Sequence, residues 1–124
     1  MSVRAETVGI SVDGQRIEGT LTVSDALDVG APGVLFVHGW GGSQAHYLYE
    51  ARAIAQAHGC ACLTFNLRGH AETEAQYETV TREDNLRDAL AAYDVLANRL
   101  GINKSCIALV GSSLYLVRTA YDAR

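Results

Sequence analysis

The sequence predicts an α/β fold in a single domain, 1–124, with a mostly parallel sheet that is preceded by an antiparallel β-hairpin. Three observations support this prediction: the first 23 residues alternate between apolar and polar side chains, three later segments are short unbroken apolar runs, and two segments of helical spacing separate those runs. Unbroken apolarity is typical of a strand that is covered on both faces, as in parallel sheets. The β-α-β order implies right-handed crossovers, so we expect three layers with helices on both faces of the sheet.

The hairpin is the first predicted element. Apolar residues alternate over 8–12, Asp13-Gly14 follows, and the alternation resumes over 17–23. Asp-Gly between two alternating runs is a strong hairpin signal, because a type I′ turn needs positive φ at both central positions. A loop over 24–32 then leads to the first buried strand, 33–37.

Two helices and two more strands are predicted after that strand. Ser43 is the expected cap of a helix over 44–58 that ends at Gly59, and its inward side chains are Leu48, Ala51, Ile54 and Ala55. The second buried strand is 60–67. Thr81 is the expected N-cap of a helix over 82–100, which Gly101 ends, and its apolar residues at helical spacing are Leu86, Ala89, Leu90, Tyr93, Leu96, Ala97 and Leu100. The last strand is 106–110.

The composition of the chain argues against two classes of partner, nucleic acids and membranes. Hydrophobic residues make up 48% of the chain, charged residues 19%, and the net charge is −4, which is typical of a folded globular chain. The lysines and arginines are scattered and form no basic patch, so a nucleic-acid partner is not expected. No apolar run approaches the roughly 20 residues of a membrane span, and we expect no signal peptide and no membrane partner.

The three cysteines do not form a disulfide framework, because their number is odd. Cys60 and Cys62 lie two residues apart on one predicted strand, where same-side neighbours have poor disulfide geometry. Cys106 opens the last strand and is expected to be a small core hydrophobe. The expected compartment is a reducing cytoplasm.

The turn after the last strand carries the candidate nucleophile. The segment 110–113, Val-Gly-Ser-Ser, resembles the nucleophile elbow G-x-S-x-G, in which a serine sits on a tight strand-to-helix turn. This register makes Ser113 the nucleophile and Ser112 the variable position. Tyr115 stands where the pattern has its second glycine.

The turn after strand 33–37 resembles the oxyanion loop of α/β-hydrolases. It reads His38-Gly39-Trp40-Gly41-Gly42-Ser43, and in that family its backbone N–H acts together with the N–H of the residue after the nucleophile. The resemblance assigns these two donors to Trp40 and Leu114. A dinucleotide-binding G-x-G-x-x-G is the rival interpretation, but it puts Gln44 at the third glycine, and the next strand ends in Asn66 instead of an acid.

The turn after strand 60–67 resembles the D-x-R-G-H-G-x-S segment of the same family. Asn66, Ala71 and Thr73 replace the commoner residues there. With three such segments in order, the chain resembles the α/β-hydrolase superfamily, near the dienelactone-hydrolase-like and serine-aminopeptidase-like acyl hydrolases. The resemblance implies an incomplete α/β-hydrolase fold with sheet order 1-2-4-3-5, in which four residues brace the active-site loops: His38, Gly39, Arg68 and His70.

The remaining polar residues carry no further site. The four histidines lack the H-x-x-x-H or H-E-x-x-H spacing of a metal site, so no metal is predicted, and the resemblance implies no cofactor. The carboxylates of Glu72, Glu74, Glu78, Glu83 and Asp84 are interpreted as a solvated loop and helix start.

The resemblance implies a serine acyl hydrolase that acts on a small-molecule ester, thioester or amide. In this fold the triad runs Ser…Asp/Glu…His along the chain, and after Ser113 the sequence contains Asp122 and no histidine. We therefore expect a chain that stops just past the nucleophile turn, through truncation, internal deletion or frameshift, and that is inactive alone. The alternative is a non-catalytic α/β-hydrolase-like module that pairs with a missing half, or with its own copies through strand 106–110.

Overall fold

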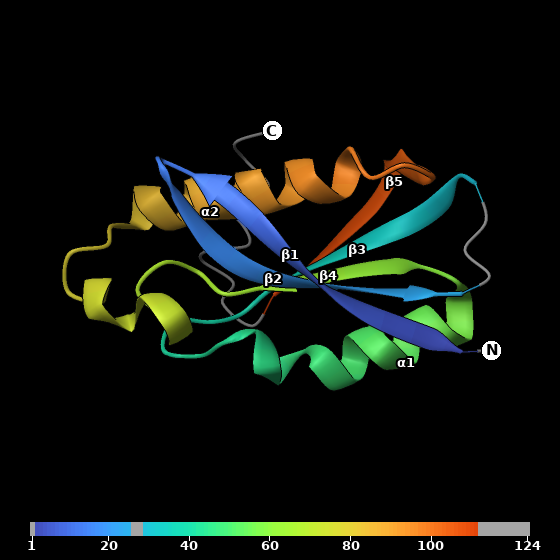
Figure 1. Cartoon of the computed structure of the whole chain (residues 1–124), viewed down its shortest axis with the longest axis horizontal. Coiled ribbons are helices and arrows are strands. Elements are labelled where there is room, and N and C mark those ends of the chain that lie inside the picture. The colour runs from blue at the N-terminus through green and yellow to red at the C-terminus, as the bar shows by residue number, and fades with distance from the viewer. Residues whose placement is uncertain (1, 26–28, 112–124) are drawn as a thin grey trace.

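The computed structural model describes residues 2–25 and 29–111. Five strands, two α-helices and two 3-10 helices follow one another along this part of the chain (Figure 1). Their bounds are β1 Val3–Val12, β2 Gln15–Ser24, β3 Ala31–Val37, η1 Gln44–His46, α1 Leu48–His58, β4 Ala61–Phe65, η2 Ala71–Gln76, α2 Arg82–Ala97 and β5 Ile102–Gly111.

The strands form one mixed sheet in the order β1-β2-β4-β3-β5, which confirms the expected order. The hairpin β1–β2 is antiparallel, β2 pairs antiparallel with β4, and β3 pairs parallel with both β4 and β5. The predicted hairpin turn is confirmed as well, because Asp13 and Gly14 both have positive φ, 49° and 77°.

The two α-helices cover opposite faces of the sheet, so the three-layer architecture is confirmed (Figure 1). On one face α2 packs against a large core that contains Leu35, Leu63 and Phe65, each fully buried. On the other face α1 places Ala51 and Ala55 against Phe36. Strands β3 and β4 are therefore buried on both sides, as their unbroken apolar sequence predicts.

The first predicted helix, 44–58, is divided in the structure. Ser43 caps the short helix η1, with Ala45 N–H donating to Ser43 Oγ at 3.2 Å, and the chain bends at Tyr47 before α1 begins. Leu48, predicted to point inward, lies in the first turn of α1 and is 39% exposed. The predicted end is confirmed, since Gly59 closes α1 with φ 66°.

The second predicted helix, 82–100, is shorter than expected. Thr81 caps it as predicted, in a capping box with Asp84. The helix ends at Ala97, where the Asn98 side chain donates to the Asp94 carbonyl at 2.8 Å. Leu100, predicted on the apolar face, lies beyond that end and is 94% exposed.

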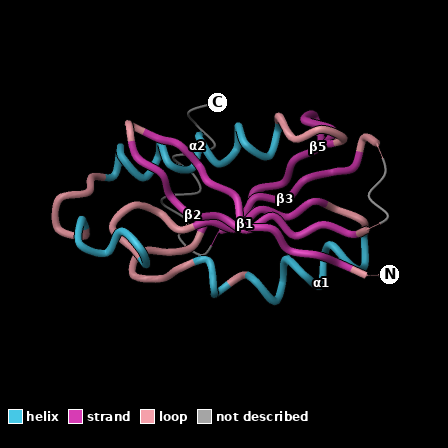
Figure 2. The backbone as a smooth tube through the Cα atoms, viewed as in Figure 1, coloured by secondary structure: helices cyan, strands magenta, loops and turns pink. Residues whose placement is uncertain are grey.

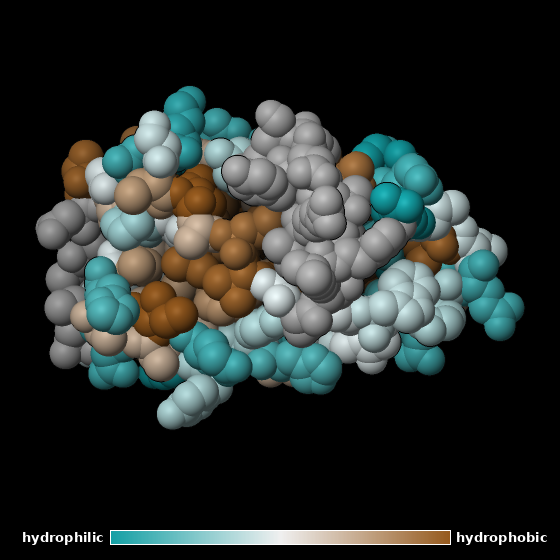
Figure 3. All heavy atoms as spheres, turned by 180° about the vertical axis from the view of Figure 1, so that it is seen from behind, coloured by the Kyte–Doolittle hydropathy of each residue, from teal (hydrophilic) through white to brown (hydrophobic). Residues whose placement is uncertain are grey.

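Strand β5 corrects the prediction of a buried strand at 106–110. It is longer, from Ile102, and forms the edge of the described sheet next to β3. Ile107 and Leu109 pack partly against the core under α2, whereas Cys106 is exposed and is therefore not a core residue. The reason is that α1 packs against β2 and β4 and does not cover β5. Figure 3 shows hydrophobic side chains gathered on the rear face, on the β5 side of the molecule.

None of the helices in the described part of the chain is long and apolar enough to cross a membrane.

Candidate functional site

Three strands end level with one another at one end of the sheet. In the register, Val37 at the end of β3 lies opposite Phe65 of β4 and opposite Gly111 of β5. The loops that leave β3 and β4 gather at this end, on the left of Figure 2. The carboxyl ends of parallel strands are where α/β sheets bind ligands, so this end of the sheet is the candidate site. We call residues 38–43 the β3 turn and residues 66–73 the β4 turn.

His38 joins these two turns. Its side chain is fully buried, Nδ1–H donates to the Gly39 carbonyl at 2.8 Å, and Nε2 accepts from Leu67 N–H at 3.0 Å. Burial lowers the pKa of His38 to about 4. A neutral ring whose two nitrogens are both engaged is a structural link and is not available as a base.

His70 makes a second link between the same turns. Its Nε2 accepts from Gly41 N–H at 2.8 Å, and Nδ1–H donates to the Arg68 carbonyl at 3.2 Å. The ring lies edge-on to His38, at 4.9 Å between centroids, and to Trp40, at 4.7 Å. The backbone of the β3 turn is therefore held from the β4 turn at two points.

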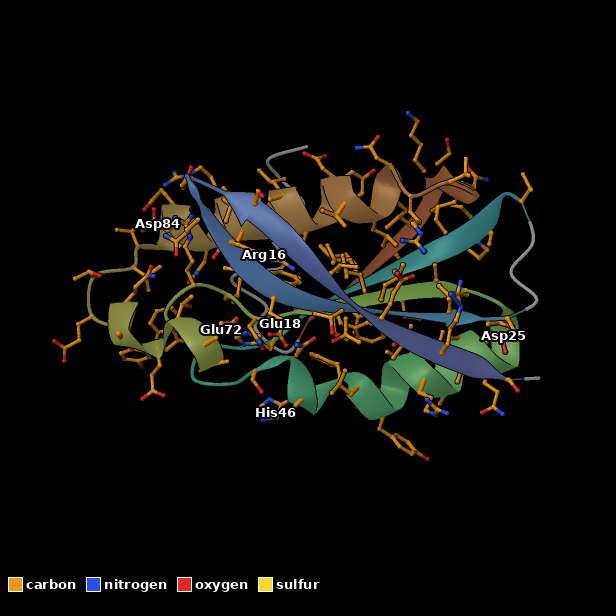
Figure 4. The ribbon with its side chains drawn as sticks, in the orientation of Figure 1. Arg16, Glu18, Asp25, His46, Glu72 and Asp84 are labelled. Atoms are coloured by element: carbon orange, nitrogen blue, oxygen red, sulfur yellow. The ribbon has the colours of Figure 1, made fainter. Side chains whose placement is uncertain are left out.

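Asn66 connects the end of β4 to both 3-10 helices. Its Oδ1 accepts from Gln44 N–H at 2.8 Å, and its Nδ2 donates to Glu72 Oε1 at 2.9 Å. The other Glu72 oxygen accepts from Glu18 N–H at 3.4 Å, and Figure 4 shows these two residues side by side. Glu72 is thus a hydrogen-bonded carboxylate and does not simply face solvent as predicted. An aspartate at 66 has no N–H to donate to Glu72, which explains the departure from the family pattern.

Arg68 anchors the β4 turn to α2 and to the hairpin. Its Nε donates to Asp88 Oδ1 at 2.6 Å, its backbone N–H donates to Asp88 Oδ2 at 2.8 Å, and its guanidinium lies 2.8 Å from Asp13 Oδ2. Burial raises the pKa of Asp88, while hydrogen bonds from Arg68 and Asn85 favour its ionised form. A buried charge needs such partners, so this cluster fixes the position of the turn.

Asp88, Asn85 and Tyr77 were missed in the sequence. Asn85 and Asp88 are buried polar residues on the α2 face that also buries Ala89 and Ala92. That signal was available, because polar residues at helical spacing within an apolar face indicate a buried polar cluster. Tyr77 lies in an irregular segment, where periodicity gives no signal.

Trp40, the predicted oxyanion donor, lies on the β3 turn with its side chain 52% exposed. Its indole Nε1–H donates to Tyr77 Oη at 2.6 Å, and the two rings lie 5.0 Å apart. Its main-chain N–H donates to no other residue in the described ranges. The N–H of Gly41, one residue later, is already taken by His70.

A surface cavity of about 710 Å³ lies beside the β3 turn. We call it the β3–η2 cavity, because one wall is Gly41 and Gly42 and the other is η2 with the residues that follow it. Its lining residues are Gly41, Gly42, Gly69, His70, Ala71, Glu74, Ala75, Tyr77, Glu78 and Thr79.

Ser113 and Leu114, the predicted nucleophile and second oxyanion donor, lie outside the described residues. Gly111, the last described residue, is opposite Val37, immediately before His38. Within residues 2–25 and 29–111, no group of three or more histidine, cysteine, aspartate or glutamate side chains is arranged to hold a metal ion.

The fold and the braced turns define an α/β protein with a candidate site at the carboxyl ends of its strands. Residues 34–114 match the sequence model of the alpha/beta hydrolase family. The chain belongs to this family. No curated protein sequence matches it.

Solved structures share the fold. A dienelactone hydrolase-like promiscuous phosphotriesterase from metagenomic libraries has a TM-score of 0.77 and 20% identity, over 97% of this chain and 54% of its own. The dienelactone hydrolase from Anabaena variabilis has a TM-score of 0.77 and 21% identity, over 98% of this chain and 58% of its own. A bacterial heroin esterase has a TM-score of 0.75 and 24% identity, over 99% of this chain and 39% of its own. The chain therefore spans about half the length of these structures.

Proposed function

We propose that this chain is the nucleophile-bearing part of a serine acyl hydrolase that acts on a small-molecule ester, thioester or amide. The observation that carries the proposal is the register of β3 with β5. It sets Gly111, the residue before Ser112 in the sequence, level with Val37, the residue before the β3 turn. Family membership over 34–114 supports the same reaction class.

In this proposal Ser113 is the nucleophile, and the N–H groups of Trp40 and Leu114 hold the developing oxyanion. Trp40 suits this role because its N–H has no acceptor among the described residues, while the next N–H is held by His70. A preorganised donor needs a fixed backbone. His38, Gly39, Arg68 and His70 would provide it through the contacts described above. The three cysteines, unpaired in the structure, suit the predicted reducing cytoplasm.

The test is labelling of the 124-residue chain with a fluorophosphonate, with Ser113→Ala and Ser112→Ala as a matched pair. An oxyanion hole without a complete triad retains a rate of about 10³–10⁴ over water, so slow labelling is measurable. We expect labelling to be lost in Ser113→Ala and retained in Ser112→Ala. Equal labelling of both variants contradicts the assignment of Ser113.

Turnover of p-nitrophenyl acetate by these 124 residues alone is expected to stay near background. The segment after Ser113 holds no histidine to take the serine proton. Turnover that is well above background and is lost in Ser113→Ala would contradict this expectation and would require a base from another chain.

A second candidate function, a non-catalytic module that associates through β5, is favoured by one observation. Val110 is 37% exposed on a strand that forms the edge of the described sheet. Absence of any labelling in a folded chain, together with stable self-association, would favour this alternative.

A further inference from the structure

We infer that the β3–η2 cavity binds a positively charged group, so that the acyl substrate of the proposed hydrolase carries an ammonium group. The inference rests on the proposed function only where it identifies the bound molecule as the substrate of a hydrolase. The binding of a cation is argued from the cavity itself.

The position of the cavity makes it a compartment of the candidate site. One wall is the backbone of Gly41 and Gly42 in the β3 turn, next to Trp40, whose N–H has no acceptor among the described residues. Gly41 has φ 87°, a conformation that favours glycine, and a Cβ there would have no atom within 4 Å. The backbone wall is thus open to a ligand that lies against it.

The charged side chains among the described lining residues are all acidic. Glu74 and Glu78 are exposed and line the cavity, and neither carboxylate forms an ion pair or hydrogen bond with another described residue. His70 also lines it, but its Nε2 accepts from Gly41 N–H and is therefore unprotonated. Among the residues that the structure describes, no lysine or arginine lines the cavity.

Two arginines near the β4 turn, Arg68 and Arg87, already have acidic partners outside the cavity. Arg68 is paired with Asp88 and Asp13, and Arg87 is paired with Asp13 and Asp84. The two free carboxylates of the cavity therefore attract a cation from solution.

An aromatic ring, Tyr77, also lines the cavity, and Trp40, which is not a lining residue, packs against it. Tyr77 lines it and is 42% exposed, and the Trp40 ring lies 5.0 Å from the Tyr77 ring, held by the hydrogen bond between Nε1 and Oη. The faces of tryptophan and tyrosine rings attract cations, most strongly ammonium and guanidinium groups. The two carboxylates and the Tyr77 ring around one cavity both favour a cation, whereas an anionic ligand would meet repulsion from Glu74 and Glu78.

The experiment measures binding without turnover. Trp40 is the only tryptophan of the chain, so intrinsic fluorescence reports on this site alone. The probes are the ethyl ester of γ-aminobutyrate, which carries an ammonium group at neutral pH, and ethyl pentanoate, which has a methyl group in its place. Each is titrated into the 124-residue chain at low ionic strength, where exposed charges are least screened.

We expect the ammonium ester to bind about three- to tenfold more tightly than the neutral ester, the range for an exposed cation with one aromatic and two carboxylate partners. The double variant Glu74→Gln/Glu78→Gln should reduce this preference to less than about twofold. Glu83→Gln makes the same change at an exposed residue outside the cavity and should keep the preference. Circular dichroism checks that each variant is folded.

Equal affinity for the two esters, or no fluorescence change with either, overturns the inference. A preference that survives in the double variant overturns it as well. Ser113→Ala should keep the preference unchanged, because the inference rests on Glu74, Glu78 and Tyr77 and assigns no binding role to Ser113. Absence of fluorophosphonate labelling in the unchanged 124-residue chain, together with an intact ammonium preference, would overturn the proposed hydrolase and leave the cation site standing.

Discussion

At the scale of single residues, the candidate site depends on polar side chains that are buried and fully engaged. His38, His70 and Asn66 each connect the β3 turn or η1 to the β4 turn through one hydrogen bond of 2.8–3.0 Å. Because the unmade hydrogen bond of a buried polar group costs about 1–3 kcal/mol, such links hold a backbone in one arrangement. Two predictions belong to this scale.

His38 makes the stability of the chain depend on pH. Its pKa is lowered to about 4 in the fold by burial, whereas an unfolded histidine titrates near 6.5. The unfolded state therefore binds a proton that the folded state does not, and stability is lost as the pH falls from 6.5 towards 4. A pKa difference of about 2.5 corresponds to about 3 kcal/mol.

Urea unfolding between pH 6.5 and 4 measures this dependence. We expect His38→Gln to remove most of the slope that the histidine contributes. His46→Gln changes an exposed histidine and should leave the slope as it is. An identical slope in the wild-type chain and in His38→Gln would contradict the prediction.

Ala71 occupies a backbone conformation that suits glycine. Its φ is 51°, and it stands at the position of a glycine in the family pattern. The left-handed conformation costs an alanine roughly 1–2 kcal/mol, and a glycine avoids this cost. The greater freedom of glycine in the unfolded state offsets roughly 0.5–1 kcal/mol of that gain. We expect Ala71→Gly to raise the free energy of unfolding by up to about 1 kcal/mol in urea titrations. Ala75→Gly, in the same segment without positive φ, should not stabilise the chain.

At the scale of elements, local signals placed most boundaries and tertiary contacts moved the rest. The turn at Asp13-Gly14 and the caps at Thr81 and Gly59 follow from residues that favour one backbone geometry over a few positions. The end of α2 does not follow from local residues. Leu100 fits the helical spacing and yet lies beyond Ala97, in the connection that leads into β5. Spacing alone does not tell a side chain on the core face from one past the helix end.

The capping box of α2 gives the prediction at this scale. Thr81 Oγ1 accepts from Asp84 N–H at 3.1 Å, and Asp84 Oδ2 accepts from Thr81 N–H at 2.9 Å. We expect Thr81→Ala to lower the free energy of unfolding by about 1 kcal/mol, because it leaves a helix N–H without its acceptor. Thr81→Ser retains the hydroxyl and should cost far less, as measured by chemical unfolding. Equal losses in the two variants would count against the cap.

At the scale of the whole molecule, β5 is the least covered strand of the described sheet. Cys106 and Ala108 are exposed and Val110 is 37% exposed, on the side of the strand that faces away from the α2 core. Within β5, the segment 106–110 is apolar and carries neither charge nor proline, a composition typical of strand pairing between chains. We expect the 124-residue chain to form a species larger than a monomer.

Ala108→Lys tests this expectation by light scattering at matched concentrations. A lysine there should shift the population towards the monomer, and circular dichroism should show an unchanged fold because Ala108 is exposed. Thr7→Lys introduces the same charge on β1, at an exposed position at the other edge of the sheet, and should not change the association. A monodisperse wild-type monomer at high concentration would contradict the prediction.

The sequence by itself determined the order of strands and helices, the hairpin, the turns that follow β3 and β4, and the family. Each of these depends on periodicity or on a short motif, which the chain carries locally. Only the tertiary structure decided that Asp88 is buried beside Arg68, that Tyr77 stands against Trp40, and that one side of β5 is uncovered. These features join residues 20 to 37 positions apart, or depend on which helix covers which strand. Their energy comes from partners that meet only when the sheet has formed, so a local pattern can indicate that Asp88 is buried but cannot identify the residue that it pairs with.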